Sequence, residues 1–114
     1  MIVNKTKKTI ITNKFFEKGS FGKMKGLMGE KNPAAVVFNT RFGIHTFFLR
    51  FPIDIIILDK TGKVVVLKKE LKPNRIFFWN MKFNTIIELP KDSLEKSKTQ
   101  IGDTILLQEE SRNT

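Results

Sequence analysis

The clearest structural signal in this sequence is the stretch IDIIILDKTGKVVVLKKEL, residues 53–71. Residues 53–58 and 63–71 are rich in β-branched and other apolar side chains, as strands require. The four residues between them, Asp59-Lys60-Thr61-Gly62, are typical of a type I turn in which Gly62 takes the positive-φ position. The stretch therefore predicts a β-hairpin.

Further short β-prone runs lie on both sides of this hairpin, separated by turn signals. They cover Ile2 to Thr12, Ala34 to Phe38, Ile44 to Phe51, Arg75 to Trp79, Phe83 to Leu89 and Thr104 to Gln108. The first run predicts one strand with a polar face. The run from Ile44 to Phe51 is apolar on both faces, which predicts a central strand between two layers.

Two short helices are also predicted. Ser20 is placed to cap a helix over Phe21 to Met28, and Asp92 or Ser93 to cap a helical turn that extends to Lys98. About seven short strands with one or two short helices are typical of a mainly β protein, a compact antiparallel sandwich or small barrel. At 114 residues, the chain has room for a single domain over 1–114, and we expect residues 109–114 to form a flexible tail.

Composition excludes several classes of protein. The sequence contains no cysteine, so disulfides, thiolate metal sites and thiol nucleophiles are excluded. No apolar stretch has the length of a membrane span or of the core of an export signal. We therefore expect a soluble, cytoplasmic protein without membrane contact, either a monomer or a small homo-oligomer.

The formal net charge of +10 favours contact with anions, including nucleic acid. Lysine is spread along the whole chain, however, and no basic tail is present. A compositional bias explains this even spread better than a nucleic-acid-binding design. Nucleic-acid binding therefore stays an alternative.

The segment from Phe47 to Asp54, FFLRFPID, resembles the family known as domain of unknown function 192 (DUF192). Further pieces support the resemblance in the same order along the chain: Gly26-Leu27-Met28, His45-Thr46, Leu58-Asp59, Glu88-Leu89-Pro90 and Ile101-Gly102-Asp103. This chain has Leu49 where the family usually has Met, and Lys91-Asp92 where the family has a glycine. The resemblance implies a compact, mainly β domain, and it implies no established reaction, substrate or cofactor.

Two polar residues in apolar surroundings are candidates for chemistry. His45 is the only histidine, and it is either at the mouth of an aromatic-lined pocket or a core-edge residue whose ring nitrogens bond backbone or a nearby carboxylate. Asp54 interrupts an apolar run and is either a general base or ligand, or an acceptor of backbone amides and partner of a cation such as Arg50 or Arg75. No acidic cluster has metal-site spacing, so we predict neither a metal nor a cofactor.

The segment Arg75-Ile76-Phe77-Phe78-Trp79 is the best candidate for a recognition surface, because aromatic rings stack on sugars or bases and Arg75 binds anions. With strand periodicity, Arg75, Phe77 and Trp79 share one face, and Ile76 and Phe78 share the other. One face is expected to be core and the other to meet a ligand.

These observations favour a non-catalytic module that binds a small polar ligand or glycan through His45, Asp54, Arg75 and Trp79. Non-specific nucleic-acid binding through the basic surface is the first alternative. An enzyme with His45 and Asp54 as acid and base is the second, and it requires both side chains to reach one substrate.

Overall fold

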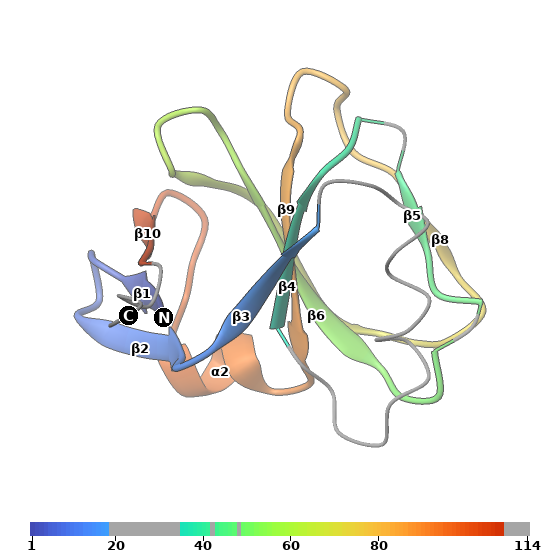
Figure 1. The fold of residues 1–114 in the computed structure, drawn as a ribbon, viewed down its shortest axis with the longest axis horizontal. Coiled ribbons are helices and arrows are strands. Elements are labelled where there is room, and N and C mark those ends of the chain that lie inside the picture. Colours follow the sequence, from blue (N-terminus) through green and yellow to red (C-terminus); the bar gives the residue numbers. More distant parts are fainter. Residues whose placement is uncertain (19–34, 42, 48, 109–114) are drawn as a thin grey trace, which may run out of the picture.

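The computed structural model describes residues 1–18, 35–41, 43–47 and 49–108. These residues form a mainly β fold of ten strands in three sheets with one short helix, which confirms the predicted fold class (Figure 1). The predicted helix from Phe21 to Met28 with its cap Ser20, and the predicted tail over 109–114, lie outside the described residues. No helix in the described parts of the chain is long and apolar enough to cross a membrane.

A five-stranded sheet crosses the middle of the molecule (Figure 1). In sheet order its strands are β3 (Phe15–Lys18), β4 (Ala35–Asn39), β9 (Thr85–Pro90), β6 (Ile53–Leu58) and β7 (Val64–Leu71). All neighbours are antiparallel except β3 and β4, which run parallel. The order is open, so the sheet is one layer of a sandwich and not a barrel.

The predicted hairpin is confirmed as β6 and β7. Gly62 has a φ of 87°, the left-handed conformation expected of it. The Asp59 carboxylate accepts hydrogen bonds from the amides of Thr61 (2.8 Å) and Lys63 (3.0 Å). The turn is therefore stabilised by contacts within six residues of sequence, which is why the sequence predicts it well.

Strand β6 is buried along its whole length because it contributes to two cores. Ile56 and Leu58 pack into the helix-side core with Leu89 and Leu94. Ile55 and Ile57, with Ile53, Val36 and Ile86, belong to the core on the opposite face, which we call the aromatic-side core. The central strand between two layers is thus β6, and the prediction that Ile44 to Phe51 holds this position is wrong.

The helix-side core is covered by β1 (Ile2–Asn4), β2 (Thr9–Thr12), β10 (Ile105–Leu107) and α2 (Ser93–Ser97). Strands β1 and β2 form an antiparallel hairpin, so the single strand predicted from Ile2 to Thr12 is wrong. The chain reverses at the polar residues between the two β-prone patches. Helix α2 agrees with the predicted helical turn, but Asp92 makes no side-chain capping hydrogen bond.

The aromatic-side core is covered by the pair β5 (Ile44–His45) and β8 (Ile76–Phe77), which lies on the opposite side of the central sheet from α2 (Figure 1). Both strands are much shorter than the predicted runs of 44–51 and 75–79. The chain leaves β5 in a turn because the amide of Leu49 donates to the carbonyl of Thr46 (3.2 Å). Apolar composition alone therefore gave too long a strand.

Candidate functional site

Three of the four predicted site residues lie at the β5–β8 pair. His45 ends β5, Arg75 immediately precedes β8, and Trp79 follows β8 by two residues. His45 stands opposite Ile76 in the antiparallel register, so its strand position is next to that of Arg75. Asp54 lies elsewhere, near the start of β6.

Thr46, which is fully buried, holds this arrangement together. Its amide donates to the carbonyl of Arg75 (2.8 Å), and its hydroxyl accepts from the amide of Arg75 (2.9 Å). The same hydroxyl donates to the carbonyl of Lys72 (2.7 Å), and the Thr46 carbonyl accepts from the amide of Asn74 (3.0 Å). These bonds fix the backbone of Arg75 beside β5. Sequence reasoning missed Thr46, because its partners lie almost thirty residues away in the chain.

The outer surface of the β5–β8 pair exposes large apolar side chains. Phe78 is 70% exposed, Ile76 is 56% exposed and Phe47 is 47% exposed. The His45 ring stacks on the Phe47 ring, with centroids 5.0 Å apart and planes inclined by 20°. We call this surface, together with the exposed Arg75 that precedes β8, the β5–β8 platform, and define it as His45, Phe47, Arg75, Ile76 and Phe78.

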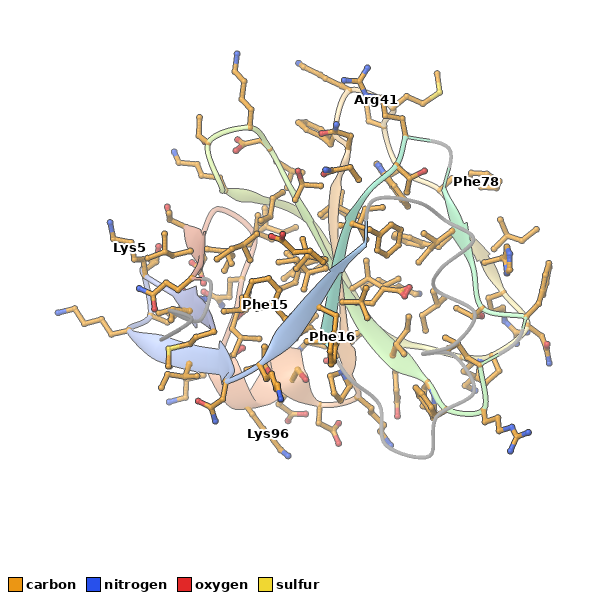
Figure 2. All side chains as sticks on the ribbon, in the orientation of Figure 1. Lys5, Phe15, Phe16, Arg41, Phe78 and Lys96 are labelled. Carbon is orange, nitrogen blue, oxygen red and sulfur yellow. The ribbon has the colours of Figure 1, made fainter. Side chains whose placement is uncertain are left out.

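The Phe78 ring is exposed to solvent but held against the backbone of the preceding loop. A Cβ atom at position 43 would fall 2.7 Å from Cδ1 of Phe78 and 2.9 Å from the carbonyl oxygen of Phe77. Gly43 also has a φ of 93°, which disfavours any side chain there. Glycine therefore leaves the space in which the ring lies, and Figure 2 shows Phe78 projecting at the outer edge of the molecule.

Trp79 faces the interior, unlike Phe78. It packs with Phe77 against the aromatic-side core, with the two ring centroids 6.0 Å apart. Its indole Nε1 donates to the carbonyl of Phe83 (2.7 Å) and so closes the loop between β8 and β9. Of the face predicted to hold Arg75, Phe77 and Trp79, the two aromatic residues pack on the core, whereas Arg75 is exposed. Ile76 and Phe78 form the exposed face.

Asp54 is a buried acceptor of backbone amides. Its Oδ1 accepts from the amide of Glu70 (3.0 Å) and its Oδ2 from the amide of Leu94 (2.9 Å). The second bond caps the first turn of α2, the role that Asp92 or Ser93 was expected to fill. Of the two alternatives for Asp54, the geometry matches the acceptor of backbone amides.

His45 and Asp54 lie on opposite sides of the central sheet. Asp54 is paired with Leu89 across β6 and β9, and Leu89 belongs to the helix-side core. Directly opposed residues on neighbouring strands point to the same face. His45 belongs to the pair that covers the other face. The two side chains do not share a site, so the geometry gives no support to an acid–base pair.

Acidic residues are absent from the segments around the platform. Residues 41–52 and 72–84 contain no Asp or Glu, whereas their cationic side chains are all exposed: Arg41, Arg50, Lys72, Arg75 and Lys82. The exposed acids of the described residues lie elsewhere, for example Glu17 on β3, Glu70 on β7 and Glu95 on α2. Lysine is evenly spread along the chain, but acidic residues are not, and the two segments that contain the platform therefore carry only cationic charges.

Glu88 is a buried carboxyl group that was not identified as a candidate site residue. It lies in β9 opposite Val36 and Ile55, which places it on the face of the aromatic-side core. Only 7% of the residue is exposed, and burial raises its pKa to about 7. The sequence contains a signal that could have identified it, because Glu88 is a charged residue within the apolar strand from Thr85 to Pro90.

The described residues include several side chains of the types that bind metals. Among them, no three His, Asp or Glu side chains come together in a group that could hold a metal ion. Asp54, the acidic residue named as a candidate ligand, uses both oxygens on backbone amides. The site geometry is that of a surface, built from aromatic rings and cations.

Solved structures with the same fold come from two bacteria. A protein of unknown function from Novosphingobium aromaticivorans superposes with a TM-score of 0.70 and 14% identity, over 82% of this chain and 74% of that one. A candidate transcription regulator from Sinorhizobium meliloti superposes with a TM-score of 0.66 and 13% identity, over 81% of this chain and 79% of that one. At these identities the similarity shows the fold alone.

Sequence comparison finds nearer relatives in archaea. A UPF0127 protein of Pyrococcus horikoshii is 38% identical over 112 residues, covering 92% of this chain and 96% of the relative. A UPF0127 protein of Thermococcus sibiricus is 35% identical over 113 residues, covering 92% of this chain and 73% of the relative. The profile of DUF192, a family described as "Uncharacterized ACR", matches residues 5–107. The chain therefore belongs to the DUF192 family.

Proposed function

We propose that this protein is a non-catalytic binding module that holds a small polar ligand or glycan on the β5–β8 platform. The observation that carries the proposal is the combination of exposed rings, at Phe47 and Phe78, with the exposed cation Arg75 on one short strand pair. A planar or apolar part of a ligand would stack on the rings. An anionic group would bind Arg75, since guanidinium groups form charge-assisted hydrogen bonds with anions.

Preorganisation supports this role. The hydrogen bonds of Thr46 fix the backbone on which Arg75 sits, and Gly43 leaves the space in which the Phe78 ring lies. A ligand would therefore meet groups whose backbone is already ordered, which lowers the entropic cost of binding. Asp54 and Trp79, by contrast, are occupied with internal hydrogen bonds and serve the fold.

The proposal is tested by a thermal-shift screen of sugars, nucleotides and other small anions with the wild type and with Phe78→Ala and Arg75→Gln. Selective binding to the folded state raises the melting temperature. A ligand that stabilises the wild type and neither variant supports the proposal. A ligand that stabilises all three proteins equally binds elsewhere and contradicts it.

Nucleic-acid binding is the second candidate, favoured by the absence of acidic residues from segments 41–52 and 72–84. It predicts an affinity that falls steeply with salt, whereas a small neutral ligand would bind with little dependence on salt.

A further inference from the structure

We infer that the β5–β8 platform binds single-stranded nucleic acid, an inference that rests on the proposed binding role of the platform and takes the second candidate ligand in place of a glycan. Three properties of the surface favour this ligand over a glycan. They are the sign of its charge, the chemistry of its exposed side chains and the fixed position of one ring.

The charge around the platform suits a polymer of phosphates. The exposed side chains at Arg41 and Lys82 flank the aromatic residues in sequence, and Arg75 lies within the platform. Several cations without intervening acids release counterions when they bind a nucleic-acid backbone, and this release drives affinity.

The exposed side chains suit bases better than sugars. The rings of Phe47 and Phe78 offer apolar faces, on which any base can stack. Carboxylates, which are charged acceptors for the hydroxyl groups of a glycan, are absent from segments 41–52 and 72–84. The Thr46 hydroxyl is engaged with the backbone at Lys72 and Arg75.

A single strand fits better than a duplex. Stacking on Phe78 requires a base whose face is free, and the faces of paired bases are covered by their neighbours in the duplex. The close approach of the Phe78 ring to Gly43 gives the ring a defined place, so a base can stack on it without reordering the loop. Sequence preference should be weak because phenylalanine reads no base edge.

The test is fluorescence anisotropy with the full chain and labelled oligo(dT) and oligo(rU) strands of about twelve nucleotides, a length matched to known single-strand sites. Binding is measured at about 50 and about 200 mM salt, beside a duplex of the same length, heparin and a neutral oligosaccharide. The variants are Phe78→Ala and Arg75→Gln. Lys96→Gln serves as the matched control, because Lys96 is exposed on α2, across the central sheet from the platform. A thermal melt of each variant checks folding.

The inference predicts that single strands bind more tightly than the duplex and that Phe78→Ala weakens single-strand binding by roughly tenfold or more. Arg75→Gln should weaken it and reduce the salt slope by about 0.7, the value for one lost phosphate contact. Lys96→Gln should change the affinity little.

Three results would overturn the inference. Equal affinity for strand and duplex, unchanged in Phe78→Ala, would mean that general charge attraction is responsible. Binding of heparin or the oligosaccharide that depends on Phe78, without binding of single strands, would reject nucleic acid and keep the proposed binding module. If no probe binds in a way that depends on Phe78 or Arg75, both the inference and the proposed function are wrong.

Discussion

The two ends of this molecule differ in which side chains are buried and which are exposed. At the end that holds β1 and β10, buried polar groups are paired with one another, whereas at the β5–β8 platform large apolar groups are exposed beside cations. Burying a polar group without a partner is costly, and so is exposing large apolar surface. The buried polar groups of the first end stabilise the fold, and the exposed groups of the second are typical of a binding surface.

The polar groups of the first end form a hydrogen-bonded network, which we call the terminal network. Its members are Asn4, Lys7, Ser97, Thr99 and Asp103. The Asp103 carboxylate accepts from Asn4 Nδ2 (2.9 Å) and from Lys7 Nζ (2.9 Å). Asn4 also donates to the hydroxyl of Thr99 (3.1 Å), which is 2.7 Å from that of Ser97. These contacts join residues more than ninety positions apart in sequence and tie β1 to the segment before β10.

The largest expected effect is at the terminal network. Asp103→Ala should lower the free energy of unfolding by about 3 kcal/mol, since Asn4 Nδ2 and the amide of Gln100 lose a charged acceptor in a buried site. Urea denaturation measures this change. A loss below about 1 kcal/mol would mean that the network contributes little to folding.

The same carboxylate gives this end a pH dependence. Burial raises the pKa of Asp103, but the hydrogen bonds from Asn4, Lys7 and the Gln100 amide outweigh this effect and hold the pKa below its ordinary value. The stability that these bonds contribute is therefore present above the ordinary aspartate pKa. It is lost as the pH falls through the lowered pKa.

A smaller effect is expected at Asp54, which connects the central sheet to α2. Asp54→Ala should cost about 2 kcal/mol, because the amides of Glu70 and Leu94 both lose their acceptor. Hydrogen exchange should show faster exchange of the Leu94 amide in this variant. If Asp54→Ala instead left stability intact and abolished ligand binding, the assignment of Asp54 to the fold would be wrong.

Glu88 should respond to pH in the opposite direction to Asp103. Its pKa in the folded protein is about 7, above the ordinary value of 4.5, so the folded state holds its proton more tightly than the unfolded state. Its contribution is fully present below the ordinary value and is lost as the pH rises through about 7.

Glu88→Gln should therefore be more stable than the wild type at about pH 8, by roughly 3 kcal/mol, and much closer to it at about pH 5. Melting curves of both proteins across this range measure the difference. Glu88→Asp is the control that keeps the ionisable group. A gain in stability from Glu88→Gln that did not change with pH would contradict the role of ionisation.

The smallest effects on stability are expected just after β8, where Trp79 faces the interior and its neighbour Phe78 faces solvent. Trp79→Phe should cost about 1 kcal/mol, because it removes the donor to the Phe83 carbonyl. Phe78→Ala should change stability by less than about 0.5 kcal/mol, since the ring is mostly exposed. Thermal denaturation of both variants makes the comparison. A larger loss for Phe78→Ala than for Trp79→Phe would mean that Phe78 serves the fold.

Local signals in the sequence predicted the fold class and the hairpin, and long-range contacts determined the rest. The turn at Gly62 depends on neighbouring residues and was predicted correctly. The end of β5 depends on Thr46, whose partners Lys72 and Arg75 come from a different segment. Hydrogen bonds between distant segments cannot be predicted from the composition or the periodicity of either segment.

The structure places three of the four predicted site residues at the β5–β8 pair, and it places Trp79 on the core face of that pair. Strand periodicity separated Trp79 from Phe78 correctly, but it could not tell which face is buried. The neighbours of β8 decide this, because Phe77 and Trp79 pack on the aromatic-side core that β6 and β9 build. His45 and Arg75 stay at the surface and remain candidates, while Asp54 lies across the central sheet.

The most direct test of the binding surface is to map contacts by NMR, following backbone amide shifts while an unlabelled oligo(dT) strand is added to the labelled protein. Binding at the platform predicts shifts concentrated at Phe47 and at Arg75 to Phe78, with the amides of the terminal network unchanged. Shifts concentrated at β1, β10 or α2, or spread evenly over the lysine-bearing surface, would contradict it.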